Sequence, residues 1–281
     1  MMSVSRTAIP KVLAITLAWV TAGAAWTPAV PASSAAPTAS SDESSEPARP
    51  LKLIDAPTAE VPGRGVYDLN VLFYPDGGLI GGIEIGLFQR FALGFTYGGL
   101  GIVGTGTPDW NPRVEFNMRY QVAPESFALP ALAIGFDSQG YGVWDDDLQR
   151  YQVKSKGFYA VASRNWALLG RFALHGGVNY SVEGNDGARR HNPDCFLGAE
   201  KTLGHDVNLM GEYDATLNDG ADRQKNGRLN FAAQWIYADR LRLQFDARNV
   251  LRSEELLHTG AATITTRNWS RGIQIAYRES F

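Results

Sequence analysis

The chain has 281 residues, of which 44% are apolar and 20% are charged, and its formal net charge is −3. A charge this close to neutral excludes the basic surface on which nucleic-acid binding depends. The mean hydropathy is −0.18 and no long apolar run follows the N-terminus, which excludes a bundle of membrane-spanning helices. The single cysteine, Cys195, excludes an internal disulfide and a cysteine-based metal site, and we expect it to be a buried thiol.

Residues 1–25 have the three parts of a secretory signal peptide. Arg6 and Lys11 give a positive start, residues 12–20 form a short apolar core, and residues 22–24 form an Ala-Gly-Ala cleavage site. The apolar core is too short to span a bilayer and remain as an anchor. We therefore predict that this segment directs export and is removed.

Residues 26–62 are rich in proline, alanine, serine and glutamate, as in the run Ser40–Pro47. A segment of this composition buries too little apolar surface to offset the conformational entropy that is lost on ordering. We predict a disordered leader over residues 26–62, followed by one barrel domain over residues 63–281.

From residue 66 onward, apolar and polar residues alternate with the period of two that marks a strand with one apolar face. In the clearest segment Leu241, Leu243 and Phe245 take every second position. Its length of about nine residues is enough for a tilted strand to cross a bilayer. We predict twelve strands, at residues 66–73, 83–87, 91–97, 114–120, 132–136, 157–164, 172–180, 195–202, 207–214, 229–237, 241–249 and 270–277.

The connections between these segments differ in length according to the end of the strands at which they lie. Short turns near residues 88–90, 203–205 and 238–240 alternate with longer polar loops. The longer loops are residues 99–112, 139–155, 183–194, 217–226 and 253–266. Outer-membrane barrels have short periplasmic turns and long external loops, and a soluble barrel has no reason to sort them. We predict an all-β fold, a closed antiparallel transmembrane β-barrel of about 12 strands in the lipid of the bacterial outer membrane.

The last predicted strand has a spacing of its own. Ser270, Gly272, Ile275 and Tyr277 follow the order polar, glycine, apolar and aromatic, and the chain ends at Phe281. This arrangement resembles the C-terminal signal that the barrel-assembly machinery reads in outer-membrane proteins. We therefore predict that these five residues form an assembly signal and that the machinery is a partner.

The polar face of the strands carries charges of both signs. We predict that ten side chains line the lumen, the space inside the barrel: Glu84, Glu115, Arg119, Asp137, Arg171, His175, Glu212, Arg242, Asp246 and Arg248. One hypothesis is a passive pore or export-associated channel for small hydrophilic solutes or polysaccharide. The other is a structural or partner-binding barrel whose lumen is closed by ion pairs. Twelve strands lie between the filled eight-stranded and the open sixteen-stranded barrels, so strand number does not decide.

Catalytic motifs are absent from the sequence. Twelve-stranded outer-membrane phospholipases use a histidine and a serine two residues apart on one strand, whereas His175 is followed by Gly176 and Gly177. The four histidines have no metal-ligand spacing. We expect no enzyme activity, no metal and no cofactor, and a lipid-modifying enzyme is the least favoured hypothesis.

Several short segments of the chain resemble the YjbH-like family of outer-membrane β-barrel proteins. They are Gly98-Gly99, Pro108–Pro112, Pro130–Asp137 and Tyr159–Arg164. The resemblance implies a barrel fold, and it points to the exopolysaccharide production with which some members are associated. These segments belong to strands and loops and contain no catalytic motif, so the resemblance assigns no functional residues in this chain.

Overall fold

A computed structural model describes residues 49–184, 192–219, 226–252, 255–259, 262–266 and 269–281, with the backbone alone described for 255–259 and 262–266. The predicted signal peptide and residues 26–48 of the predicted leader lie outside this part of the chain. No helix in the described segments is long and apolar enough to cross a membrane.

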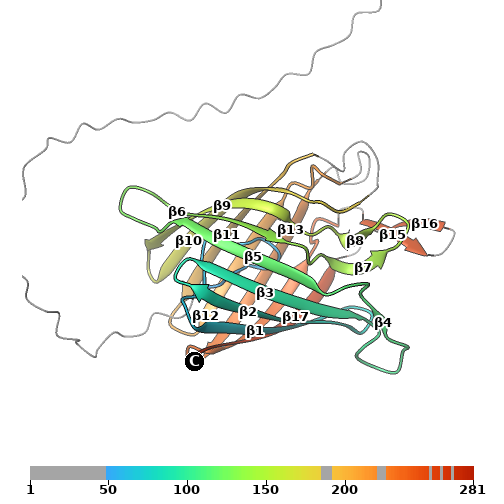
Figure 1. The fold of residues 1–281 in the computed structure, drawn as a ribbon, viewed down its shortest axis with the longest axis horizontal. Coiled ribbons are helices and arrows are strands. Elements are labelled where there is room, and N and C mark those ends of the chain that lie inside the picture. Colours follow the sequence, from blue (N-terminus) through green and yellow to red (C-terminus); the bar gives the residue numbers. More distant parts are fainter. Residues whose placement is uncertain (1–48, 185–191, 220–225, 253–254, 260–261, 267–268) are drawn as a thin grey trace, which may run out of the picture. The chain divides into compact units, whose positions relative to one another are not determined.

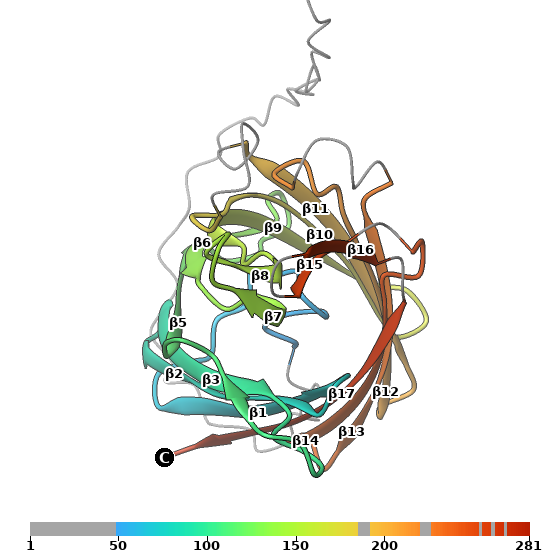
Figure 2. The same ribbon diagram turned by 90° about the vertical axis from the view of Figure 1, so that its right-hand side faces the viewer.

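Twelve antiparallel strands close into a barrel, which confirms the predicted fold (Figures 1 and 2). The ring closes because β1 pairs with β17, the last strand, on one side and with β2 on the other. In order around the ring the strands are β1 (Val66–Tyr74), β2 (Gly78–Phe88), β3 (Phe91–Leu100), β5 (Glu115–Ala123), β6 (Ala131–Asp137), β9 (Gly157–Ala167), β10 (Arg171–Tyr180), β11 (Asp194–Leu203), β12 (Val207–Asp214), β13 (Arg228–Tyr237), β14 (Leu241–Arg248) and β17 (Ser270–Ser280).

Three of the predicted loops contain short strands that the sequence analysis missed. These strands are β4 (Asp109–Trp110), β7 (Tyr141–Asp145), β8 (Arg150–Val153), β15 (Glu255–Thr259) and β16 (Ala262–Thr266). β7 pairs with β8 and β15 pairs with β16, so each pair forms a separate small hairpin. β4 pairs with the last two residues of β3. At two to five residues, these strands are too short for alternation to distinguish them from a loop.

The barrel is apolar outside and polar inside. Along β13, Phe231, Trp235 and Tyr237 are exposed, whereas Asn230 and Gln234 are buried. The other barrel strands also expose an apolar face, which is the reverse of a water-soluble protein and matches a surface that faces lipid. Their inward positions are mostly polar or small, except where buried apolar side chains such as Val161 and Phe196 occur. Cys195 also lies on the exposed side, so our expectation of a buried thiol was wrong, because the odd positions of β11 point outward.

Residues 49–62, which we call the lumen hairpin, lie inside the ring of strands (Figure 2). The segment turns back on itself, since the N–H of Leu53 donates to the carbonyl of Ala56 at 2.9 Å and that of Thr58 to Leu51 at 3.1 Å. Both arms lead to the end of the barrel where β17 ends. Arg278 donates to the carbonyl of Arg49 at 3.0 Å, and the N–H of Phe281 donates to the carbonyl of Gly65, which follows the second arm, at 3.0 Å. This is the end of the short turns, which the predicted topology makes periplasmic.

The predicted disorder of residues 26–62 is therefore wrong for residues 49–62. Leu53 and Ile54 pack with Met210 and Ala232 of the wall. Ala56 and Ala59 belong to a second apolar cluster, which includes the wall residues Ala131, Ala133, Tyr159, Val161 and Phe196. Composition underestimates how well ordered such a segment is, because its few apolar side chains find a surface to pack on only after the barrel has formed.

Candidate functional site

Glu212, on β12, holds the tip of the lumen hairpin. Its carboxylate accepts the backbone N–H groups of Ile54 at 3.1 Å, Asp55 at 3.0 Å and Ala56 at 2.8 Å. Asn230 on the neighbouring strand donates to the same carboxylate at 2.7 Å. Bonds to an ionised acceptor are about twice as strong as neutral ones, so this carboxylate is a strong attachment point for the hairpin.

Three basic side chains add further attachments. The guanidinium of Arg119 donates to the carbonyl of Leu51 at 2.8 Å and to that of Glu60 at 3.2 Å, and so ties the two arms together. Arg248 donates to both carboxylate oxygens of Asp55, at 2.6 and 2.7 Å. Lys52 of the hairpin forms an ion pair with Asp137 of the wall. The attachments therefore reach the hairpin from several sides of the barrel.

A serine and a histidine from adjacent strands meet beneath the hairpin. Ser163 Oγ lies 2.8 Å from His175 Nδ1, and His175 Nε2 lies 4.0 Å from a carboxylate oxygen of Glu200. The row resembles a hydrolase triad, but the N–H of Ala59 donates to Ser163 Oγ at 2.8 Å and covers it. Ser163 is only 1% exposed, so its hydroxyl holds the hairpin and the row offers no open nucleophile.

We expect the change Ser163→Ala to weaken hairpin docking, because the buried N–H of Ala59 would lose its acceptor. Leaving a buried donor unpaired costs about 1–3 kcal/mol. The refolded barrel should unfold at a lower urea concentration, followed by tryptophan fluorescence. The control is Ser126→Ala, whose hydroxyl accepts the exposed N–H of Leu129 at 3.1 Å. Water can replace that acceptor, so the midpoint should stay unchanged. Equal midpoints for the two variants would show that Ser163 does not hold the hairpin.

At the opposite end of the barrel, residues 138–156, which we call the inward loop, fold into the mouth. Tyr151 has no exposed surface and donates its hydroxyl to Glu115 at 3.1 Å. Arg150 is bonded to Asp219 at 3.1 Å. Burial raises the pKa of Glu183 to about 7, although the N–H groups of Tyr151 and Ser155 donate to its carboxylate. The inward loop is thus held against the wall of the mouth by buried side chains.

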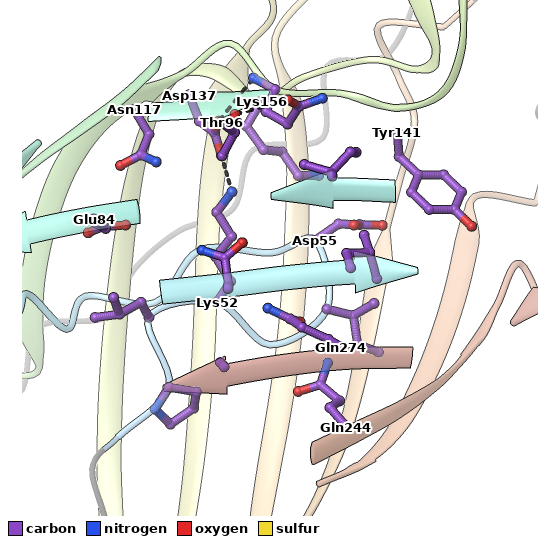
Figure 3. A pocket seen from close by; sticks show the side chains of 18 of the residues that line it. Lys52, Asp55, Glu84, Thr96, Asn117, Asp137, Tyr141, Lys156, Gln244 and Gln274 are labelled. Carbon is purple, nitrogen blue, oxygen red and sulfur yellow. Dashed lines mark hydrogen bonds and ion pairs between the residues drawn. The ribbon is translucent and has the colours of Figure 1, made fainter. Parts of the chain in front are cut away.

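Between the hairpin and the inward loop lies a cavity of about 140 Å³, which we call the chamber (Figure 3). The hairpin provides its floor with Lys52 and Asp55, and the inward loop provides its roof with Tyr141 and Lys156. The side wall comes mainly from β1, β2, β3, β5, β14 and β17. The volume corresponds to about five water molecules at 30 Å³ each.

Carboxamide side chains occupy directly paired positions on four neighbouring strands of the lumen wall. Gln274 of β17 lies opposite Gln244 of β14, and Gln244 lies opposite Gln234 of β13. Gln234 in turn lies opposite Asn208 of β12, whose side chain accepts the hydroxyl of Thr202 at 2.5 Å. The first three of these residues line the chamber. The chamber therefore has a wall of neutral hydrogen-bonding groups.

The ten side chains that we predicted to line the lumen occupy several environments. Nine are at most 5% exposed, and the side chain of the tenth, Arg171, is 9% exposed and pairs with Glu200 at 3.1 Å. Arg119, Asp137, Glu212 and Arg248 contact the lumen hairpin. Glu84, Asp137 and Arg242 line the chamber. Glu115 lies under the inward loop, His175 under the hairpin, and Asp246 beside Arg248 at 3.1 Å. Their role toward a solute stays a prediction.

Sequence reasoning missed the hairpin, Ser163 and the carboxamides. Gln244 and Asn117 occupy polar positions of strands whose alternation was clear. The predicted lumen set contained only charged residues and His175. The inward amides were recognisable from the same alternation, so the sequence did contain a signal for them. The pairing of Ser163 with His175 gave no such signal, because it depends on the register between β9 and β10.

The predicted assembly signal lies on the strand that closes the ring. β17 is bonded to β1 and β14, and the ring of Phe281 stacks on Tyr67 with 6.4 Å between centroids. Gly272 faces inward and Ile275 outward. Recognition of Ser270, Gly272, Ile275, Tyr277 and Phe281 by the assembly machinery stays a prediction.

Comparison with known proteins gives no family for this chain. No family model matches it, and no curated protein does. Among solved structures, the KdgM porin has 10% identity and a TM-score of 0.43, covering 77% of this chain and 99% of its own. The NanC porin has 8% identity and a TM-score of 0.42, covering 76% and 99%. The siderophore receptor PiuA from Acinetobacter baumannii has 10% identity and a TM-score of 0.29, covering 72% and 36%.

These TM-scores are too low to support an argument about function. The barrel architecture rests on the strand pairing of the chain itself. The similarity to the YjbH-like family remains a resemblance, since no family model supports it.

Proposed function

We propose that this protein is an outer-membrane channel for small hydrophilic solutes, closed at rest by the lumen hairpin. The exposed apolar face of the barrel supports a position in a lipid bilayer, and closed antiparallel barrels are the β structures that span membranes. The polar lumen supports the passage of hydrophilic compounds. In the described part of the chain, the hairpin, the inward loop and the ion pairs occupy much of the lumen, which supports a closed resting state.

One observation carries this proposal: the hairpin is attached to the wall by side chains and not by strand pairing. In the part of the chain that the structure describes, the backbone ladder joins barrel strands to one another, while the isolated bridge of the hairpin joins Lys52 to Pro57 within it. The hairpin can therefore leave without breaking the hydrogen-bonded ring. A strand of the ring could not do so.

A second candidate is a permanently plugged barrel with a structural or partner-binding role. The two apolar clusters between hairpin and wall favour it, because about 25 cal/mol is gained per Å² of apolar surface buried. We propose no catalytic role, since Ser163 is covered by the hairpin.

Planar-bilayer recording from the refolded chain separates these candidates. We expect long closed periods with brief, discrete openings. In the variant Gly198→Leu openings should dominate, because an added Cβ at Gly198 already lies 2.2 Å from Cδ1 of Leu53, so a larger side chain prevents the hairpin from seating. The control is Gly81→Leu, where the only atom near an added Cβ is 4.0 Å away.

Continuous full conductance of the unmodified chain would contradict closure by the hairpin. A tight seal at all voltages, in the unmodified chain and in Gly198→Leu alike, would contradict the channel and favour the plugged barrel. The control variant should behave like the unmodified chain.

A further inference from the structure

Seven of the eight charged side chains that line the chamber are matched with opposite charges. The pairs are Lys52 with Asp137, Asp55 with Arg248, Asp68 with Arg242, Glu84 with Arg119, and Lys156 with Asp214. Lys154 donates to the carbonyl of Asn218 at 2.9 Å. An ionic ligand entering such a space loses its hydration without meeting a free opposite charge, which is unfavourable. The chamber therefore disfavours anions and cations.

Neutral hydrogen-bonding groups are present in the same space. Six carboxamides line the chamber: Asn70, Asn117, Gln139, Gln234, Gln244 and Gln274. Asn117 and Gln234 are each 6% exposed, and among the described residues Oδ1 of Asn117 and Oε1 of Gln234 have no hydrogen-bond partner. Buried polar atoms are nearly always bonded, so two acceptors are left for a ligand or water in the chamber.

The chamber also has an apolar side. Leu72 and Ile80 of the wall and Val153 of the inward loop line it, and Ile80 and Val153 are buried. A carboxamide both donates and accepts, which matches a hydroxyl group. A space with amides on one part of its wall and aliphatic groups on another suits a molecule with hydroxyls at its edge and C–H groups on its faces.

We propose that the chamber binds an uncharged polyhydroxylated compound of the size of one sugar ring. The volume of about 140 Å³ sets the size and the paired charges exclude ions. Gln139 and Gln244 are bonded within the protein, so the hydroxyls bond to carboxamides such as Asn117, Gln234 and Gln274. Figure 3 shows Asn117, Gln244 and Gln274 around the same space. The compound is one that the closed channel holds, because opening removes Lys52 and Asp55 together with the hairpin, and the inference rests on the proposed function for the route to the chamber.

The test is equilibrium dialysis of the full chain in a detergent without a sugar head group. The probes are glucose, glucuronate and glucosamine, which share one ring and differ in charge. We expect glucose to bind about tenfold more tightly than either charged probe. The variants Asn117→Ala and Gln274→Ala should each weaken glucose binding about tenfold, since each removes a group that would bond a hydroxyl.

The matched control is Asn208→Ala, which removes a carboxamide from the same row of the wall. Asn208 does not line the chamber, so glucose binding should be unchanged. Equal binding of all three probes, tighter binding of a charged probe, or unchanged binding in Asn117→Ala and Gln274→Ala would overturn the proposal. Dialysis requires no conductance: a chain that binds glucose but never conducts contradicts the channel alone, and one that conducts without preferring glucose contradicts this inference alone.

Discussion

Replacing Glu212 with alanine is expected to hold the channel open. The change removes the acceptor of three backbone N–H groups at the hairpin tip. Bonds to a charged group contribute about 1.5–3 kcal/mol each. A loss of only 3 kcal/mol shifts the ratio of docked to released hairpin by about two orders of magnitude. In single-channel recording, the fraction of time that the channel is open should rise from brief openings in the unmodified chain to most of the recording in the variant.

The control for this variant is Glu200→Ala. Glu200 is also a buried lumen carboxylate, but it pairs with Arg171 on the wall. Its loss should change stability and leave the open fraction low. Closed traces from Glu212→Ala, with the protein correctly folded, would show that Glu212 does not keep the hairpin docked.

The second large effect is expected from a covalent link between hairpin and wall. We expect the pair Leu53→Cys and Gly198→Cys to form a disulfide. A Cβ at position 198 lies 3.6 Å from Cγ of Leu53, which is near the place of a cysteine sulfur at position 53, so a small adjustment brings the two sulfurs within bonding distance. Cys195 is replaced by alanine to avoid a wrong pairing. Oxidation should abolish openings, and a reductant should restore them.

Each single-cysteine variant is the control, because it carries one of the two changes without the link. Neither should respond to oxidant. Combining the pair with Glu212→Ala gives the sharpest comparison, since an oxidised link should close a channel that the loss of Glu212 has opened. Unchanged conductance through the linked barrel would mean that solutes pass beside a docked hairpin, and closure would then need another explanation.

The fold was largely predictable because its signals are local. Alternation along a strand depends on neighbours two residues apart, and Leu241, Leu243 and Phe245 of β14 show it without any knowledge of the partner strand. The sorting of short turns from long loops is also a property of sequence order. These two signals gave twelve strands and closure, and both agree with the structure.

The candidate site could be predicted only in part. The polar positions of strands gave Glu212 and Arg248 as lumen residues, but their partners are the backbone of residues 54–56 and the carboxylate of Asp55. Those partners lie more than 150 positions away in sequence, within a segment whose composition indicated disorder. No periodic pattern spans such a separation.

The sequence by itself determined which face of each strand is apolar, because that depends on a repeat of two residues. Only the tertiary structure decided what fills the lumen. The apolar groups of the hairpin have no surface to pack on until β6, β9, β11, β12 and β13 have taken their places in the ring. The carboxamides form a row only when register sets Gln244 opposite Gln234 and Gln274. Both depend on contacts between distant parts of the chain, which composition and periodicity do not record.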